Sequence, residues 1–351
     1  MNIGLIDVDG HNYPNLALMR ISAYHKQHGD LVEWYQGPMI RPWYDIVYAS
    51  KVFSDDYSTD FDWSKVTNAG EIIKGGTGYC ISLGADGKEH FDENKNVKLP
   101  AEFEGMFPDY SLYPQFPFAI SFTSRGCPNN CGFCHVAQKE GCCSVKVADV
   151  SDFWRPDIGK SEIQVMDPNI TACREKLELF RQYRETGAVI EFNQGLDIRL
   201  INDADIEAIN AMRLKKIHFA WDRTDLDLTK RFEYYKARAK HKPKGRYGTV
   251  YVLTNYDNCS VEEHVKRAEW RIYTLRALNF DPYLMVYDKP HAPKALLNMQ
   301  RWCNNKVIFG KVPLFEEYKK EDHKAKEKTS GRPIPMKGTG DRPTMDGGAR
   351  R

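Results

Sequence analysis

Residues 118–135 read FAISFTSRGCPNNCGFCH, and this stretch decides the fold that the sequence predicts. The apolar run over 118–122 has the length and composition of a buried strand. Three cysteines follow it directly, Cys127, Cys131 and Cys134, with the spacing C-x3-C-x2-C. Thiolates this close together can bind one iron–sulfur or zinc centre. The stretch therefore predicts a metal-binding loop at the carboxyl end of a strand.

Strand and helix signals alternate along the chain after this loop. Five more apolar segments predict strands, over 163–166, 189–193, 217–221, 249–254 and 283–287. Helical periodicity appears between them, over 171–186, 203–212 and 261–278. Six βα units in series predict a parallel (β/α)6 partial TIM barrel, whose chemistry lies at the carboxyl ends of its strands.

The first hundred residues contain a smaller series of the same kind. Strand signals lie over 4–8, 31–35, 45–53 and 71–74. A helix is expected to open at Pro14, because the first helical turn has no use for the N–H that proline lacks. This pattern predicts a small, open parallel sheet of the flavodoxin or Rossmann type.

The α/β pattern of the chain divides into four parts. The stretch over 108–117 is rich in proline and aromatic residues and is interpreted as a linker. It separates an N-terminal α/β domain over 1–107 from the barrel domain over 118–315. The last part, 316–351, is rich in Lys, Glu, Gly and Pro, and a disordered tail is expected there.

Composition excludes several classes of protein. The chain has 351 residues, with 50 basic and 48 acidic side chains, so its net charge suggests neither a nucleic-acid coat protein nor a membrane-surface binder. No apolar run approaches the roughly 18 residues that a membrane span needs. The N-terminus lacks the features of a secretory signal. We therefore expect a cytoplasmic protein whose nine cysteines include metal ligands and do not form a disulfide framework.

The number of cysteines in the loop carries information of its own. A structural zinc site usually has four closed ligands, and no fourth cysteine stands at a zinc-finger spacing. Three thiolates on a four-iron cluster leave one iron without a protein ligand. That open iron is a place where a cofactor or substrate can bind.

At this point the sequence resembles the radical S-adenosylmethionine (SAM) superfamily. Cys127, Cys131 and Cys134 match its CxxxCxΦC motif, Phe133 stands at its aromatic position, and the resemblance covers residues 116–290. It implies a [4Fe-4S] cluster that reductively cleaves SAM to a 5′-deoxyadenosyl radical acting on an unidentified substrate. It also implies a one-electron donor such as flavodoxin or ferredoxin. Cobalamin-dependent methylation and methylthiolation are alternative outcomes.

The resemblance also implies cofactor contacts at two further strand ends. Asp167 and Asn169 follow the second barrel strand, where the superfamily receives the amino group of SAM, although the GGE form of that motif is absent. Both residues can equally cap the next helix. Polar residues follow the third strand as well, namely Asn193, Gln194, Asp197 and Arg199. The sequence singles out no catalytic residue.

The N-terminal domain resembles the cobalamin-binding domains that precede some radical SAM barrels. Its loop from Asp9 to Pro14 is similar to the Asp-x-His-x-x-Gly motif, with His11 at the cobalt-ligating position. Pro14 replaces the glycine, the Ser-x-Leu segment is not evident, and Gly75-Gly76 matches a later motif only loosely. These departures disfavour bound cobalamin. His11 is then a loop residue or a substrate contact.

Two hypotheses from other classes stay open. One is a non-catalytic iron–sulfur protein for electron transfer or sensing, and the other is a zinc-stabilised nucleic-acid-binding protein. Residues 230–246 carry eight basic side chains against one acidic, interleaved with aromatic residues, which gives weak support for RNA contact. A solvated helix face is the alternative interpretation of this segment.

Overall fold

A six-stranded, all-parallel sheet forms the larger part of the fold, in the order β14-β13-β12-β11-β10-β7. The computed structural model describes residues 1–318 except 56, 86–87 and 243–244. The strands of this sheet are β7 (Phe118–Ser121), β10 (Glu162–Val165), β11 (Val189–Leu196), β12 (Arg213–Ala220), β13 (Thr249–Thr254) and β14 (Asp281–Val286). Each predicted strand is present, and all carboxyl ends lie at the same edge of the sheet.

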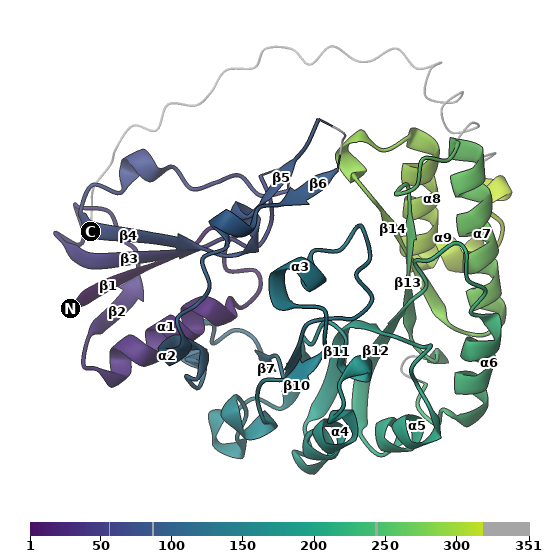
Figure 1. Ribbon diagram of the computed structural model, residues 1–351, viewed down its shortest axis with the longest axis horizontal. Coiled ribbons are helices and arrows are strands. Elements are labelled where there is room, and N and C mark those ends of the chain that lie inside the picture. The colour runs from purple at the N-terminus through teal and green to yellow at the C-terminus, as the bar shows by residue number, and fades with distance from the viewer. Residues whose placement is uncertain (56, 86–87, 243–244, 319–351) are drawn as a thin grey trace, which may run out of the picture. The chain divides into compact units, whose positions relative to one another are not determined.

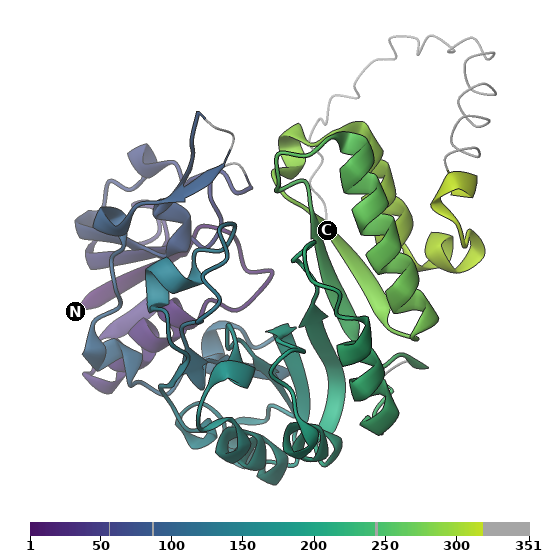
Figure 2. The ribbon, with the colours of Figure 1, turned by 45° about the vertical axis from the view of Figure 1, so that its right-hand side comes forward.

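Helices cover the outer side of this curved sheet (Figures 1 and 2). They are α4 (Lys176–Glu185), α5 (Asp203–Asn210), α6 (Thr229–Arg238), α7 (Val261–Ala277) and α8 (Lys294–Asn304). The longest of them, α7, begins after Ser260, whose hydroxyl accepts a hydrogen bond from the N–H of Glu263 at 3.2 Å. Its buried stripe includes Ala268, Ile272 and Leu275, which holds the helix against β13 and β14 by apolar burial.

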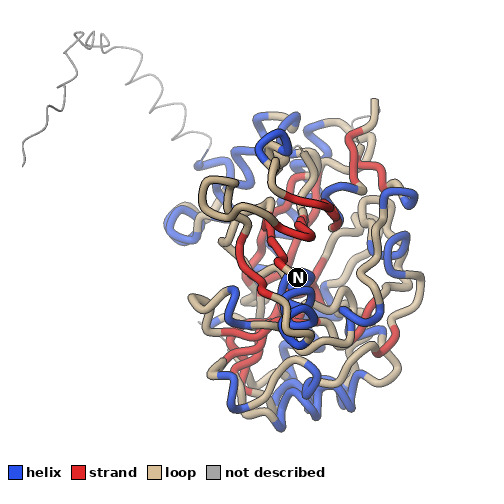
Figure 3. Tube along the Cα trace, turned by 90° about the vertical axis from the view of Figure 1, so that its left-hand side faces the viewer, coloured by secondary structure: helices blue, strands red, loops and turns tan. Residues whose placement is uncertain are grey.

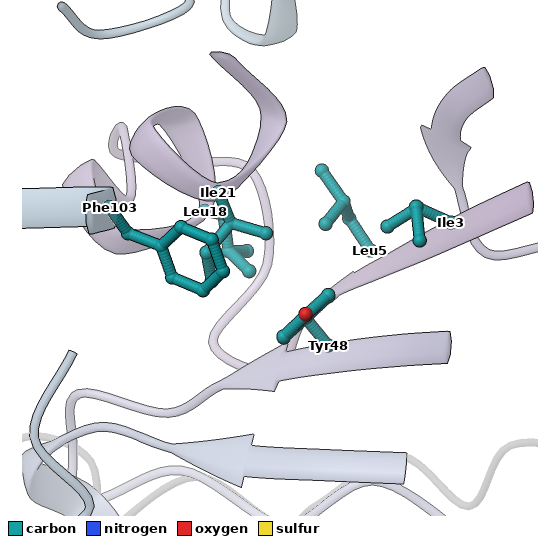
Figure 4. Close-up of a cluster of buried hydrophobic side chains, with 6 residues drawn as sticks. All are labelled: Ile3, Leu5, Leu18, Ile21, Tyr48 and Phe103. Atoms are coloured by element: carbon teal, nitrogen blue, oxygen red, sulfur yellow. The ribbon is translucent and has the colours of Figure 1, made fainter. Parts of the chain in front are cut away.

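A second parallel sheet, in the order β2-β1-β3-β4, is formed by the first part of the chain. Its strands are β1 (Asn2–Asp7), β2 (Leu31–Trp34), β3 (Tyr44–Ser50) and β4 (Ala69–Gly75), and its helices are α1 (Leu16–Gln27) and α2 (Ala101–Glu104). One face packs on these helices through Ile3, Leu5, Leu18, Ile21, Tyr48 and Phe103 (Figure 4). The small parallel sheet expected from the sequence is therefore present.

Helix α1 begins two residues later than expected. Asn15 is its N-cap, and the side-chain oxygen accepts a hydrogen bond from the N–H of Leu18 at 3.3 Å. Pro14 therefore lies in the loop and does not open the helix. An asparagine oxygen satisfies a free N–H group of the first turn, a contribution that proline cannot make.

The connection between β3 and β4, which contains the 3-10 helix Trp63–Lys65, covers the other face of the N-terminal sheet. The apolar residues there are Ile6, Tyr44, Val47 and Ala49, with Phe61, Trp63 and Val66 of the β3–β4 connection packed on them. Figure 3 faces this part of the chain and shows long loops between its short helices and strands.

Short elements complete the described chain. Two antiparallel pairs are β5 (Ile81–Leu83) with β6 (Glu89–Phe91) and β8 (Ser124–Arg125) with β9 (Val145–Lys146). Two short α-helices are α3 (Val136–Glu140) and α9 (Lys306–Lys311). The 3-10 helices are Trp63–Lys65, Thr77–Tyr79, Glu93–Lys95, Tyr110–Leu112, Val150–Asp152, Pro156–Ile158, Ile170–Ala172 and Lys289–His291.

The chain up to Asn304 forms one compact unit, and a second unit begins at Asn305. The predicted linker over 108–117 is packed in place, since Tyr113 is 1% exposed and its hydroxyl donates to Asp7 at 2.6 Å. The domain boundaries expected from the sequence stay predictions. The expected tail over 316–351 falls largely outside the described residues. None of the helices in the described ranges has the length and apolar character to cross a bilayer.

Candidate active site at the cysteine loop

The three cysteines lie in a loop that the β8–β9 pair closes at its base. The two ends of the loop over 126–144 therefore lie side by side, at the β8–β9 pair. Gly126 has a φ of 84°, and a Cβ at this position would lie 2.1 Å from the main-chain oxygen of Cys143. Only glycine satisfies both conditions. The N–H of Cys127 donates to the carbonyl oxygen of Gly141 at 3.1 Å, so the returning limb holds the first cysteine in place.

Cys127, Cys131 and Cys134 all line one cavity of about 1400 Å³, which strands β11 to β14 also line. This volume exceeds the 300–1,000 Å³ of ordinary ligand pockets, so it has room for a cofactor and a substrate together. The three cysteines are free thiols of intermediate exposure. Burial raises the pKa of Cys131 and of Cys134, and ligation of a metal would remove the thiol protons.

The donor set suits an iron–sulfur cluster. Within the described part of the chain, no three His, Cys, Asp or Glu side chains are grouped to hold a single metal ion. A four-iron cluster makes a different demand, because each cysteine binds an iron atom of its own. The Asn169 amide Nδ2 lies 3.5 Å from Cys127 Sγ and can donate to the ligating sulfur. The residues of the loop therefore fit a four-iron cluster.

Phe133 fixes the tip of the loop against the end of β13. Its ring meets that of Tyr256 edge to face, with centroids 5.3 Å apart. A Cβ on the neighbouring Gly132 would lie only 2.5 Å from the Tyr256 hydroxyl, so glycine allows this close approach. Phe133 also lines the cavity. Its predicted role in cofactor binding stays a prediction.

Asp167 lies beneath the loop and binds the chain that leads into it. The carboxylate is 3% exposed and accepts hydrogen bonds from the main-chain N–H groups of Thr123 and Ser124 at 2.8 and 2.6 Å. Both hydroxyl groups donate to it as well, each at 2.7 Å. Burial raises the pKa of Asp167, and these donors oppose the rise. Asp167 does not cap the helix that follows it, and it is not part of the cavity wall.

The other three predicted contacts do line the cavity. Asn169 is buried beside Cys127, and its side-chain oxygen accepts from the Thr171 hydroxyl at 2.6 Å. Asn193 donates through Nδ2 to Gln164 Oε1 at 3.1 Å. Gln194 is exposed on the same strand. Their assignment to the cofactor stays a prediction, but the structure brings all three to the cysteine loop.

Asp197 joins the cysteine loop to the end of β11. It accepts a hydrogen bond from Asn129 Nδ2 at 3.0 Å. Arg199 donates to the same carboxylate through two nitrogens, at 2.7 and 2.6 Å. The Arg199 and Asn129 hydrogen bonds outweigh burial, so the pKa of Asp197 is lowered and the carboxylate is charged. This pair therefore bridges the cysteine loop and the segment after β11, and both residues also line the cavity.

A buried arginine behind the cavity is a feature that sequence reasoning missed. Arg271 of α7 is 1% exposed and donates to the carbonyl oxygens of Trp221 at 2.7 Å and Leu253 at 2.9 Å. Arg271 and Asp222 lie close enough that each stabilises the charged form of the other. Burial nevertheless raises the pKa of Asp222 to about 6. The available signal was the position of Arg271 on the apolar stripe of a helix, where a charged residue needs buried partners.

Loops of the N-terminal sheet reach both edges of the six-stranded sheet. Near one edge, the Tyr13 hydroxyl donates to Gln164 of β10, the strand next to the edge strand β7, at 2.6 Å. At the other edge, the N–H of Glu89 donates to the hydroxyl of Tyr287, which follows β14, at 3.0 Å. Among the described residues of the N-terminal sheet and its loops, Phe53 alone lines the large cavity.

The carboxyl edge of the N-terminal sheet is filled by side chains of the chain itself. Lys51, at the end of β3, is fully buried and forms an ion pair with Asp55. A Cβ on Gly76 would lie 2.2 Å from the Lys51 carbonyl oxygen, so Gly76 serves this packing, whereas a Cβ on Gly75 would come no closer than 3.9 Å to the Val97 carbonyl oxygen. The His11 ring packs on that of Trp34, with centroids 4.1 Å apart.

The basic segment over 230–246 is tied to the sheet at one of its arginines. Arg231 donates to the carbonyl oxygens of Ile198 and Ile201, at distances between 2.9 and 3.3 Å. Arg238 forms an ion pair with Asp203 at 2.7 Å. These contacts favour a structural helix face, and nucleic-acid binding stays a prediction. Residues 243–244 lie outside the described residues.

Comparisons with known proteins give likeness in structure. No protein-family model matches the chain, and no curated protein is similar to it in sequence. The radical SAM methyltransferase TsrM from Kitasatospora setae, solved with cobalamin and a [4Fe-4S] cluster, aligns with a TM-score of 0.55 at 11% identity, over 81% of this chain and 74% of that one. Its complex with tryptophan substrate and the SAM analogue aza-SAM aligns equally well, over 82% and 72%.

A third structure extends the likeness. The cobalamin-dependent SAM radical enzyme OxsB, with aqua-cobalamin and SAM bound, aligns at a TM-score of 0.50 and 13% identity, over 97% of this chain and 63% of that one. The expected resemblance is confirmed at the level of the fold. The two parallel sheets, with the cysteine loop after β7, give this chain the fold of the radical S-adenosylmethionine enzymes.

Proposed function

We propose that the chain is a radical SAM enzyme that generates a 5′-deoxyadenosyl radical and uses it to remove a hydrogen atom from a substrate. The observation that carries the proposal is that Cys127, Cys131 and Cys134 line a single large cavity at the carboxyl ends of the parallel strands. This is the edge at which barrel enzymes place their chemistry. The three-thiolate set leaves one iron of a four-iron cluster open.

The chain's own residues position this chemistry. When bound, the cluster would supply one electron that splits SAM into methionine and the radical, which becomes 5′-deoxyadenosine on taking the hydrogen atom. Asp167 holds the strand end before the loop, and Asp197 holds its middle through Asn129. The loop is therefore fixed at both places before any cofactor arrives. Such preorganisation keeps the reacting groups in place.

Cobalamin-dependent methyl transfer is the second candidate, because TsrM and OxsB were solved with cobalamin bound. Two features of the N-terminal sheet of this chain weigh against that cofactor. Lys51 fills the end of β3, and the glycines beyond β4 pack against main chain. We therefore favour hydrogen abstraction without cobalamin. The departures of this sequence from the cobalamin-binding motif support the same choice.

The experiment is anaerobic reconstitution with iron and sulfide, reduction with dithionite, and quantification of 5′-deoxyadenosine formed from SAM. We expect the full chain to form it, and expect Cys127→Ala, Cys131→Ala and Cys134→Ala each to lose iron and product. Cys142→Ala and Cys143→Ala are matched controls from the exposed part of the same loop, and both should retain them. A protein that holds a cluster but never cleaves SAM would support the electron-transfer hypothesis. Bound zinc without iron or sulfide would support the zinc hypothesis.

A further inference from the structure

The inner surface of the six-stranded sheet is polar where a closed barrel is normally apolar. Alternate residues of a strand point to the same side, and Lys216, His218 and Ala220 of β12 all line the cavity. Ile217 and Phe219, between them, are buried on the helix side. Barrel interiors are usually filled by branched apolar side chains. Lys216 is exposed and can be hydrated, whereas His218 is buried, so the polar groups of the imidazole depend on partners within the protein or on a ligand.

His218 presents a hydrogen-bond acceptor to the cavity. Its Nδ1 lies 2.6 Å from the carbonyl oxygen of Phe192, which can only accept, so Nδ1 carries the proton. The ring stacks on Tyr251 with centroids 5.1 Å apart and planes 6° apart, which fixes its orientation. The side chain is 3% exposed. Nε2 is then a lone-pair acceptor, and no described residue donates to it.

Thr254 gives a sign of a missing ligand at another place in the same cavity, five residues along β13 from Thr249, the register partner of His218. Its hydroxyl oxygen is buried, lines the same cavity and has no hydrogen-bond partner among the described residues. A buried hydroxyl without a partner is destabilising, because the loss of its hydration is not compensated. Such a group is unusual in a folded protein, and a bound ligand is one explanation for it.

Lys216 supplies a cation two residues before His218 on the cavity side of β12. It forms no ion pair or hydrogen bond with any described residue. Its neighbour in the sheet register is Glu191, which instead lies 3.4 Å from Gln164 Nε2 and 3.6 Å from Lys215 Nζ. Lys215 itself pairs with Glu162 at 2.6 Å. Lys216 is thus the free cation of the described cavity wall on β12.

We propose that this surface is the substrate site, and that it binds a small molecule carrying an anionic group, a phosphate or a carboxylate, together with a hydroxyl or amine donor. Lys216 pairs with the anion, and His218 Nε2 accepts from the donor. Two residues of a strand span about 7 Å, so the two groups of the ligand must be separated by a few bonds. Calling this ligand a substrate rests on the proposed function. The binding test does not depend on SAM cleavage.

The test measures binding of simple probes to the full chain, without SAM or reductant. Inorganic phosphate and acetate are titrated, and their NMR line widths are followed. We expect at least one anion to bind, with affinity falling about tenfold or more in Lys216→Met. Lys215→Met is the control for the loss of one nearby positive charge. It unpairs Glu162 and Glu191 but keeps Lys216, so its affinity should fall much less than that of Lys216→Met. The preferred anion identifies the kind of substrate.

The second arm tests the acceptor. Glycerol 3-phosphate carries hydroxyl donors a few bonds from its phosphate and should bind several-fold more tightly than inorganic phosphate. His218→Phe keeps the stacked ring but removes Nε2, and it should abolish this advantage, whereas His218→Gln retains an acceptor and should keep part of it. Circular dichroism checks that both variants fold. Equal binding by Lys216→Met and the unmodified chain, or no binding of either anion, overturns the proposal and leaves SAM cleavage untouched.

Discussion

The carboxylate of Asp167 accepts two hydrogen bonds from Ser124, one from its main-chain N–H at 2.6 Å and one from its hydroxyl at 2.7 Å. Ser124 opens the short strand that leads into the cysteine loop. The end of β10 therefore holds the base of a loop that begins on a different strand. A residue expected to contact the cofactor acts in this structure as a support of the cluster loop.

Asp167→Asn tests this support. Each carboxylate oxygen accepts from a different main-chain N–H, and an amide can replace only one of these acceptors, so the other N–H would face an NH2 group. We expect a loss of about 2–4 kcal/mol in the free energy of unfolding and a lower iron content after reconstitution. Urea unfolding and iron analysis measure both. Ser124→Ala removes one hydroxyl donor and should cost only about 1 kcal/mol. Unchanged stability in Asp167→Asn would refute the supporting role.

A pair of glycines separates steric fit from backbone strain in the cysteine loop. Both Gly126 and Gly141 have positive φ, 84° and 102°. A Cβ at Gly126 would meet the Cys143 oxygen at 2.1 Å, whereas a Cβ at Gly141 meets nothing within 4 Å. Gly126→Ala should therefore abolish iron loading. Gly141→Ala should lower the free energy of unfolding by about 1–2 kcal/mol through backbone strain and should still load iron. Equal iron content in the two variants would show that the contact at Gly126 is unimportant.

His218 makes stability depend on pH. Burial, with a smaller contribution from Lys216, lowers the pKa of His218 to about 4, although the Phe192 carbonyl and Asp281 oppose the shift. The unfolded chain takes up this proton near pH 6.5, before the folded chain does. The stabilisation is therefore complete above pH 6.5 and is lost as pH falls toward 4, by about 3 kcal/mol in all.

Urea unfolding between pH 7 and pH 4.5 checks this dependence. His218→Gln cannot titrate, so the unmodified chain should lose stability more steeply than the variant over this range. Parallel curves for the two proteins would mean that folding does not lower the pKa of His218, which would contradict the burial of this side chain as an uncharged imidazole.

Hydroxocobalamin is predicted not to bind the full chain. Lys51 and the packed glycines occupy the edge of the N-terminal sheet where the cofactor would enter. Titration followed by gel filtration should leave the cobalamin absorbance in the small-molecule fraction. Stoichiometric co-elution with the protein, lost in His11→Ala, would contradict the prediction and restore cobalamin-dependent methyl transfer.

The sequence predicted those features of the site that depend on residues close together along the chain. Cys127 and its two partners are close in the chain, so their common position followed from spacing alone. The role of Asp167 was not predictable, because its partners Thr123 and Ser124 lie more than forty residues earlier and meet it only when β7 pairs with β10. Similar reasoning applies to the start of α1, where Pro14 was a plausible first residue until Asn15 was seen to cap the helix.

The polar interior was hidden from the sequence for the same reason. His218 and Tyr251 stand on different strands, and their stacking follows from a register that pairs His218 with Thr249. Nothing in the segment over 213–220 distinguishes a polar residue that faces a cavity from one that faces solvent. Only the arrangement of β11 to β14 around one cavity makes the difference.

Electron paramagnetic resonance of the reduced, anaerobically reconstituted chain, recorded with and without SAM, tests the central claim most directly. The open iron that three cysteines leave on a four-iron cluster predicts a four-iron signal that shifts when SAM is added. A four-iron signal indifferent to SAM, or the absence of any cluster signal, would contradict the assignment of Cys127, Cys131 and Cys134 to a SAM-binding cluster.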